Sequence, residues 1–304
     1  SGTGTWDQSA GVVNVGGWPA IGRLAGSTGT LNVSGTGAFN QTATDRGFVV
    51  GEEGTGTLNI QGTATVTSAG SVGVLVSNNA TGVGTVNLDG GTLQALKISD
   101  GGGNSTFNFN GGVLKAGVGA NLNFMGGLDS VNVKPGGAII DSNGQTIAIS
   151  QVLGDLGGNV TKQGTGTLRL NAANPYLGTT TVSAGALGGT GSVGGELVVS
   201  SGASIAPGAS AGTFTVEDTL GNGSTIDGTY ACEVDGATAD KLVILGDLTV
   251  GAGAVLDFST LSAPTAASYE IATFTSITGT FIEQNVPAGY EVVYGPTSIT
   301  LEQT

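Results

Sequence analysis

A short motif recurs through the first third of the chain: an asparagine flanked by two apolar residues, usually just after Gly-Thr or Ser-Thr. The clearest copies are centred on Asn32, Asn59, Asn87 and Asn108, at successive steps of 27, 28 and 21 residues. Looser copies are centred on Asn14, Asn123 and Asn132. Steps of about 20–50 residues indicate stacked structural repeats. The alternation predicts strands with inward apolar residues and an outward asparagine, bonded from coil to coil.

Glycine accounts for 58 of the 304 residues, a far larger share than the usual ~7%. Only 10% of the residues are charged, yet 38% are hydrophobic, which excludes the charge-driven disorder of weakly hydrophobic chains. Glycine permits tight corners with positive φ, and here it separates apolar stretches of strand length. The chain is therefore expected to be all-β. It is predicted to form a right-handed parallel β-helix, in which equivalent residues of successive coils stack about 4.8 Å apart.

The composition divides the chain into two predicted regions. Residues 1–216 are expected to form the parallel β-helix of irregular Gly-, Thr- and Asn-rich repeats. Residues 217–304 are expected to form a C-terminal β-rich capping region that packs on the solenoid or continues it. The charge is uneven as well, because residues 1–150 carry −3 and residues 151–304 carry −11 of the total of −14.

The composition also excludes several classes of protein. There is no histidine, so Ser-His-Asp and Cys-His catalysis and the usual imidazole zinc sites are ruled out. The eight Lys and Arg residues are too scattered to neutralise nucleic-acid phosphates. We expect no nucleic acid partner and, without a run of ~20 apolar residues, no membrane insertion. Because the chain opens inside the repeat pattern, we expect that a secretion leader has been removed and that the protein is extracellular.

A second motif covers residues 159–187, which read NVTKQGTGTLRLNAANPYLGTTTVSAGAL. This segment resembles the autotransporter-associated β-strand repeat of bacterial surface proteins, whose pattern is TKxGxGTLxLxGxNxYxGxTxVxxGxL. It departs from that pattern at Ala172, Ala173 and Pro175, and the resemblance extends over residues 157–216. It implies a secreted structural protein of the bacterial surface.

Other stretches, such as residues 50–60 and 272–301, resemble secreted proteins that carry a C-terminal sorting tail of the PEP-CTERM type. No such tail follows Thr304, so we expect it to be absent or cleaved.

Two further motifs are expected to be structural. Cys232 alternates with Tyr230 and Val234 on one face of a predicted strand, as a small buried hydrophobe does. The segment from Gly189 to Gly194 formally matches the dinucleotide-binding pattern GxGxxG. That site requires a helix directly after the glycines, whereas the following residues have the pattern of a strand.

An enzyme remains a minor alternative, because some parallel β-helices cleave polysaccharides with paired carboxylates or with calcium and a base. The densest charged cluster comprises Asp45, Arg46, Glu52 and Glu53, and we expect it to be a pair of solvated corners. We therefore predict a protein that is not an enzyme.

Calcium is a minor possibility at the acidic corners. Asp-Gly pairs begin at Asp89, Asp100, Asp227 and Asp235. Asp-Gly is first a turn signal, and none of these pairs has the spacing of a nonapeptide calcium repeat or an EF-hand loop. No cofactor and no metal site are therefore expected.

Threonine and tryptophan raise two binding alternatives. Regular columns of threonine on a flat β-helix face can bind ice, but the irregular steps of 27, 28 and 21 residues argue against such columns. Trp6 and Trp18, the two tryptophans, either pack within the repeat or stack on sugar rings as in an adhesin.

The first coil carries the predicted assembly site. An uncapped solenoid end exposes unpaired backbone groups that favour further strand pairing, and the chain shows no helical or charged cap before the first coil. We expect another copy to pair end to end or by strand exchange with Gly2, Thr3, Gly4, Thr5, Trp6, Val13, Val15 and Trp18.

The predicted function is accordingly structural. Head-to-tail pairing that does not close would make the protein the subunit of an extracellular filament or surface matrix, with other copies of itself as partners. Surface polysaccharide is a further expected partner. The alternative is a monomeric autotransporter-type adhesin passenger that binds carbohydrate or a host surface.

Overall fold

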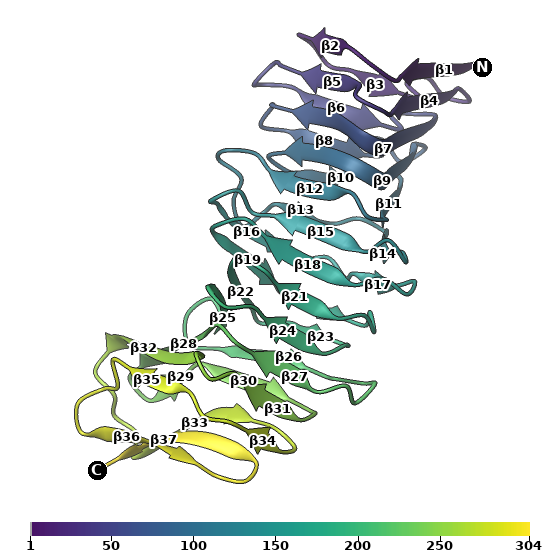
Figure 1. Ribbon diagram of the computed structural model, residues 1–304. Helices are drawn as coiled ribbons and strands as arrows, with labels where there is room; N and C mark the ends of the chain where they lie inside the picture. Colours follow the sequence, from purple (N-terminus) through teal and green to yellow (C-terminus); the bar gives the residue numbers. More distant parts are fainter. Residues whose placement is uncertain (1) are drawn as a thin grey trace. The chain divides into compact units, whose positions relative to one another are not determined.

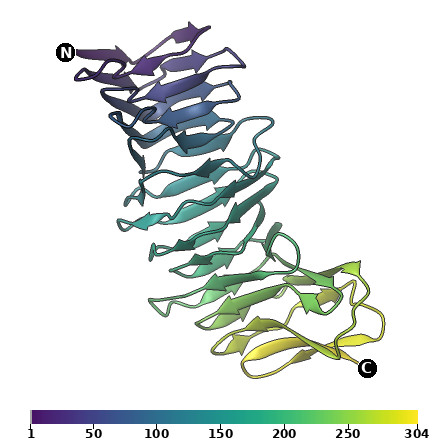
Figure 2. The same ribbon diagram turned by 180° about the vertical axis from the view of Figure 1, so that it is seen from behind.

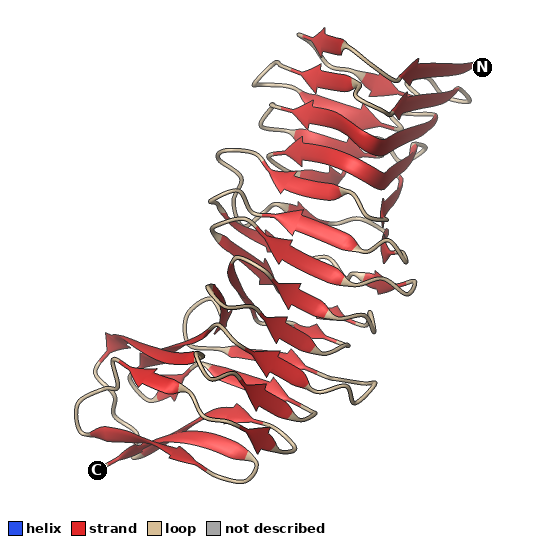
Figure 3. Ribbon diagram, viewed as in Figure 1, coloured by secondary structure: helices blue, strands red, loops and turns tan. Residues whose placement is uncertain are grey.

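The computed structural model describes residues 2–304 as β-strands joined by turns and loops, without any helix in that range (Figures 1 and 3). The strands pair in parallel to form a β-solenoid of about 11 turns, which confirms the predicted fold class. By their packing, residues 1–160 and 161–304 form two compact units.

Three columns of strands build the first unit, and each coil contributes one strand or strand segment to each column. The first column contains β1 (Thr3–Gln8), β4 (Thr28–Val33), the first part of β7 (Thr55–Ser68), the first part of β9 (Val83–Ala95), β11 (Asn104–Phe109) and β14 (Ser130–Val133). The second contains β2 (Val12–Val15), β5 (Ala38–Gln41), the last parts of β7 and β9, β12 (Val113–Ala116) and β15 (Ala138–Asp141).

The third column of this unit contains β3 (Ala20–Ile21), β6 (Gly47–Val50), β8 (Gly73–Val76), β10 (Ile98–Asp100), β13 (Met125–Gly126) and β16 (Thr146–Ile149). The last strand of the unit to pair with the first column is β17 (Gly154–Asp155). Every pairing described in these columns is parallel, and the purple-to-teal strands stack in both views (Figures 1 and 2).

The second unit repeats this plan. After β18 (Val160–Gln163), the next strand along the chain begins the first column of this unit. That column contains β19 (Thr167–Leu170), β22 (Gly185–Gly189), β25 (Ala203–Pro207), β28 (Thr229–Asp235), β32 (Val255–Ser262) and β35 (Ile282–Gln284). The second column of this unit contains β20 (Ala173–Asn174), β23 (Ser192–Val193), β26 (Thr213–Val216), β30 (Lys241–Ile244) and β33 (Ser268–Thr273). The third contains β21 (Thr180–Val182), β24 (Leu197–Val199), β27 (Ser224–Ile226), β31 (Leu248–Val250) and β34 (Ile277–Thr278).

Apart from an isolated antiparallel bridge between Gly189 and Gly208, the pairing changes towards the end of the second unit. There β37 (Ser298–Gln303) pairs antiparallel with β33 and with β36 (Tyr290–Tyr294), and the short β29 (Thr238–Ala239) folds back on β28. Residues 217–304 therefore continue the parallel columns as far as β34 and β35. The boundary between the two compact units falls at residue 160. The composition of the sequence had predicted a boundary between regions near residue 216.

The core consists of the inward apolar residues of each coil. Leu31, Leu58, Val86 and Phe107 occupy equivalent positions in the first column and are 5% exposed or less. Cys232 is fully buried on β28, as predicted. The segment from Gly189 to Gly194 runs from β22 through β23 and is followed by β24, so it is a corner between strands, as predicted.

The recurrent asparagines form one continuous hydrogen-bonded column on the outer face of the first unit. Asn59 Nδ2 donates to Asn32 Oδ1 over 2.7 Å, Asn87 to Asn59 over 2.7 Å, and Asn108 to Asn87 over 2.8 Å. Asn132 continues the column with a bond of 2.9 Å to Asn108.

A carboxylate occupies the same column in the first coil, where Asn32 Nδ2 donates to Asp7 Oδ1 over 2.6 Å. Each amide thus donates to the preceding coil, and the acceptor-only Asp7 receives the first bond. Asn14 belongs to a neighbouring column, in which Asn40 donates to it over 3.0 Å. The looser copy at Asn123 is different, because it lies in a turn between β12 and β13 rather than in a strand.

Irregular step length does not disturb this register. Thr5, Thr30, Thr57, Thr85 and Thr106 pair residue for residue along the same strands. The expectation that unequal steps would prevent regular threonine columns is therefore wrong. Loops between the strands absorb the extra residues, while the backbone pairing sets which side chains stack.

Replacing Asn87 tests the asparagine column. The Asn87→Ala variant leaves the Asn59 oxygen without its donor and the Asn108 amide without its acceptor, so the free energy of unfolding should fall by about 1–3 kcal/mol. Thr85→Val is the matched control, because Thr85 lies on the same strand and its hydroxyl bonds no other described residue. Urea denaturation that gives equal midpoints for the two variants would contradict a stabilising column.

Candidate functional site

The structure brings some of the predicted assembly residues together. Gly4, Thr5, Trp6 and Val15 line an apolar hollow of about 430 Å³ beside Phe39. The Trp6 side chain is 52% exposed, and its ring meets Phe39 edge-on at a centroid distance of 6.2 Å.

The remaining assembly residues lie apart from this hollow. Gly2 and Thr3 are exposed, Val13 is half-buried, and Trp18 lines a different groove. β1 pairs along its length with β4. The pairing of a second copy with this coil remains a prediction.

A separate groove lies beside Trp18. Its volume is about 310 Å³, and it is lined by Trp18, Ala20, Arg23, Glu52 and Asn78. The Trp18 side chain is 43% exposed. An exposed aromatic ring therefore lies beside a cation, an anion and an amide.

The three polar residues occupy equivalent corner positions of successive coils. β3, β6 and β8 pair in register, with Ile21 opposite Val50 and Val50 opposite Val76. Arg23, Glu52 and Asn78 each follow the last of these paired residues by two positions. We refer to these three residues as the corner column. Backbone bonds extend the pairing into the corner, since the Glu52 N–H donates to the Gly22 carbonyl and the Asn78 N–H to the Gly51 carbonyl.

Residues with positive φ shape this corner. Gly22 and Gly51 have φ values of +65° and +83°, and Ser77 takes the same conformation with a φ of +61°. Ser77 is fully buried, and its hydroxyl donates to Asp100 Oδ1 over 2.6 Å and accepts the Gly103 N–H over 2.9 Å. These bonds hold a non-glycine residue in the left-handed region that few side chains adopt.

The corner column retains unused hydrogen-bonding capacity. Arg23 Nε lies 3.5 Å from Glu52 Oε2, and the two side chains are 76% and 24% exposed. The Asn78 amide makes no side-chain hydrogen bond to another described residue, and the Arg23 Nη groups make none either. Donors and acceptors thus face solvent next to the Trp18 ring, an arrangement that can bind a polar ligand with an apolar face.

The predicted charged cluster is divided between two corners. Arg46 pairs with its neighbour Asp45 over 3.4 Å, and both side chains are more than half exposed. Glu52 pairs instead with Arg23, while Glu53 is exposed. Sequence reasoning grouped Glu52 with Asp45 and missed Arg23 and Asn78. They could have been found from their common position, because each follows the last residue of a paired strand by two positions.

Three of the acidic corners are engaged in hydrogen bonds, among them Asp235, whose Oδ1 accepts the Ser262 hydroxyl. Asp100 accepts from Ser77, and Asp89 accepts from Asn110 Nδ2 over 2.8 Å. Over residues 2–304 no three His, Cys, Asp or Glu side chains lie close enough together to hold a metal ion. The same part of the chain contains no helix of the length and hydrophobicity needed to cross a membrane.

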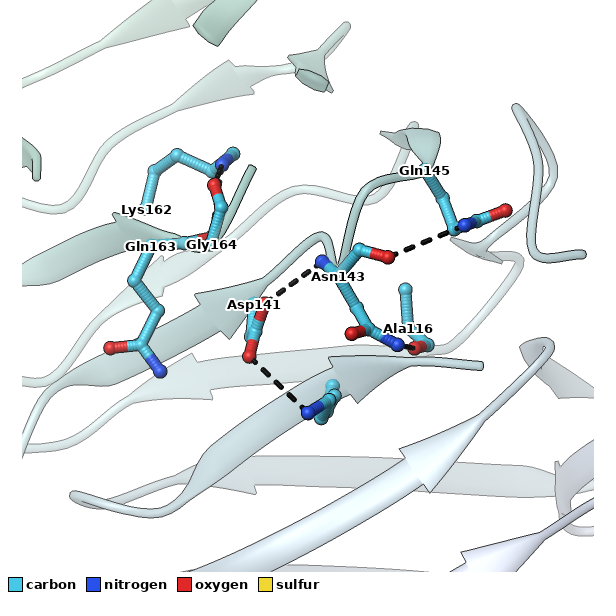
Figure 4. Close-up of polar contacts among 8 residues, drawn as sticks. Ala116, Asp141, Asn143, Gln145, Lys162, Gln163 and Gly164 are labelled. Carbon is cyan, nitrogen blue, oxygen red and sulfur yellow. Dashed lines mark hydrogen bonds and ion pairs between the residues drawn. The ribbon is translucent and has the colours of Figure 1, made fainter. Parts of the chain in front are cut away.

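A buried lysine closes the corner at the start of the second motif. Lys162 is fully buried, and its Nζ donates to the carbonyls of Gln163, Gly164 and Ala184 over 2.9, 2.7 and 3.0 Å. Figure 4 shows the side chain folded back over Gly164. Because each ammonium proton has a carbonyl acceptor, the charge is compensated inside the coil.

Other hallmark residues of this motif also point inward. Asn174 is buried and its Nδ2 donates to the carbonyls of Ala172 and Ser192. The hydroxyl of the fully buried Tyr176 is bonded to that of Thr180 over 2.8 Å, and burial raises the pKa of Tyr176 well above its usual value. The motif therefore specifies the interior and corners of the coil rather than a ligand.

A corner of the first unit is closed in a comparable way. Asn143 has a φ of +50°, and its side-chain amide donates to the Ala116 carbonyl of the preceding coil over 2.9 Å. The Asn143 N–H donates to Asp141 (Figure 4). Asp141 also pairs with Lys115 over 3.8 Å. Such corners combine left-handed backbone with a side chain that satisfies a neighbouring carbonyl.

Comparison with known proteins agrees with the motif. Residues 160–188 match the model of the Passenger-associated-transport-repeat family. The chain is also 33% identical over 199 residues to a protein of Brucella suis biovar 1 (strain 1330) named Adhesin BmaC autotransporter. That alignment covers 55% of this chain and 6% of the relative, so the chain spans a small part of the relative's length. Both findings support the resemblance to autotransporter-associated repeat proteins, and the resemblance to proteins with a sorting tail remains a prediction.

One carboxyl in the second unit has an altered acidity. Asp240 is 1% exposed, and its two oxygens accept the backbone N–H groups of Gly212 and Glu233 over 2.9 and 3.0 Å. Burial is the largest influence on this carboxyl and raises its pKa to about 7, although the two N–H bonds act in the opposite direction.

Removing the Lys162 ammonium should destabilise the coil. In Lys162→Met, three buried carbonyls lose a donor, so we expect the free energy of unfolding to fall by about 2–4 kcal/mol. Lys241→Met is the matched control, because Lys241 is part of a half-exposed pair with Glu270 and should cost at most about 1 kcal/mol. Equal losses in urea denaturation would show that the carbonyl contacts contribute little.

Asp240 should make stability depend on pH. The folded state retains this proton to about pH 7, whereas the unfolded state releases it near pH 4. Between these pH values the folded state therefore binds more protons than the unfolded state. The contribution of Asp240 to the free energy of unfolding should accordingly fall by up to roughly 4 kcal/mol as the pH rises from about 4 to about 7. Urea denaturation at several pH values in this range should show that the free energy of unfolding depends less on pH in Asp240→Asn than in the parent chain. A variant profile parallel to that of the parent would mean that Asp240 is ionised throughout.

Proposed function

We propose that this chain is part of a secreted, surface-displayed adhesin of the autotransporter-passenger type, a β-solenoid without catalytic activity that presents a binding surface. The observation that carries the proposal is the passenger-associated repeat at residues 160–188. Its hallmark side chains are buried in the coil, so the repeat builds a scaffold and leaves recognition to other residues.

The relationship to an adhesin favours this function over a filament subunit. The relative named Adhesin BmaC autotransporter is similar over 199 residues, and its name describes attachment rather than polymerisation. The apolar hollow beside Trp6 can accept a further strand, but a neighbouring segment of the same polypeptide would serve as well as a second copy. The hollow therefore gives the filament hypothesis no specific support.

Attachment can be measured with the chain immobilised on fluorescent beads. We expect saturable adhesion of the beads to epithelial cells, competed by free chain, while sedimentation shows a monomer. Beads coated with the Lys162→Met variant after thermal unfolding serve as the control for nonspecific adhesion. Fibres of the free chain in electron microscopy, combined with adhesion no greater than that of the control, would favour the filament subunit instead.

A further inference from the structure

We propose that the groove beside Trp18 binds one neutral pyranose unit of a surface glycan. This inference rests on the proposed adhesin function and identifies the ligand class at a particular site. The juxtaposition that carries it is a half-exposed indole next to the corner column of Arg23, Glu52 and Asn78.

The indole supplies the apolar half of the site. A pyranose ring has a face of C–H groups, and the flat, electron-rich face of a tryptophan ring is a suitable surface for it. Trp18 is 43% exposed within the groove, so part of its ring is available for stacking. Trp6 differs, because its ring is engaged edge-on with Phe39.

The corner column supplies the polar half. Sugar hydroxyls both donate and accept hydrogen bonds, and here a carboxylate, a guanidinium and an amide offer both functions. The coil spacing of about 4.8 Å spreads these groups along the groove at intervals comparable with a sugar ring. The available volume of about 310 Å³ lies at the lower end of the usual range for small-ligand sites, roughly 300–1,000 Å³. It therefore suits a single ring rather than a long oligosaccharide.

Charge favours a neutral ligand. The Arg23 guanidinium lies beside the Glu52 carboxylate, and this negative charge would repel a sugar carboxylate or sulfate that approaches the guanidinium. The chain as a whole carries a net charge of −14, which disfavours the approach of polyanions. Hydroxyl groups can instead bridge the two charged side chains without separating them.

The pair of charges has little structural value of its own. Exposed ion pairs contribute little to stability, and the Arg23 side chain is 76% exposed. Changes at Glu52 or Asn78 should therefore alter ligand binding without unfolding the coil. This makes the groove testable by substitution.

The test begins with the intact chain on an array of neutral and acidic glycans, followed by calorimetry with the neutral hexose oligosaccharide that binds best. Trp18→Ala should weaken binding at least about tenfold, because it removes the ring on which the sugar stacks. Glu52→Gln should weaken it by about fivefold, because a neutral amide replaces a charged hydrogen-bond acceptor. The matched controls Trp6→Ala and Glu53→Gln should stay within about twofold, since neither residue lines the groove. Circular dichroism of every variant confirms the fold.

Three outcomes would overturn the inference: no binding to neutral glycans, binding to acidic glycans only, or neutral-glycan binding that Trp18→Ala and Glu52→Gln leave unchanged. The bead assay separates this failure from that of the adhesin proposal. Cell attachment that persists in Trp18→Ala would refute the groove and leave the adhesin function standing. If beads coated with the parent chain do not attach to the cells, the proposed function itself is refuted.

Discussion

The parallel hydrogen bonding between successive coils is the constraint on which the other features depend. It forces residues at equivalent positions to stack, so one choice of side chain is repeated along a column. Inward columns become the core, as with Leu31, Leu58 and Val86. Outward columns bond to themselves, as the asparagines from Asn32 to Asn132 do. Because backbone pairing sets the register, loops of different length are tolerated between strands.

The same register separates scaffold from recognition. In the passenger-associated repeat, Lys162 and Asn174 satisfy carbonyls of the corner, and Tyr176 fills the core. The side chains of these residues are buried and bonded within the coil, so they are not available to a partner. The corner column of Arg23, Glu52 and Asn78 is built by identical pairing, yet its side chains face solvent. A binding surface can therefore change at the corners without any change in the coil interior, which suits a surface-displayed protein.

Much of the fold could be predicted from residues that alternate or recur. The asparagine motif predicted stacked strands, and Cys232 was placed in the core because it alternates with apolar neighbours. The copy at Asn123 was misread as a strand, because a turn can carry the same three-residue pattern by chance. The charged cluster forms two solvated corners, as expected, but the sequence did not show which residue Glu52 pairs with. In the fold, Glu52 pairs with Arg23, which is distant in sequence but one coil away.

The sequence by itself determined a histidine-free, glycine-rich parallel solenoid and its outward asparagine columns, because alternation and glycine corners act locally. It also carried the passenger-associated motif, although the roles of Lys162 and Tyr176 required the packed coil. Only the tertiary structure decided that Trp18 lies beside Arg23, Glu52 and Asn78. These residues belong to three coils separated by unequal loops, and no local rule states which corner positions will stack. The hydrogen-bonded register of β3, β6 and β8 makes that choice.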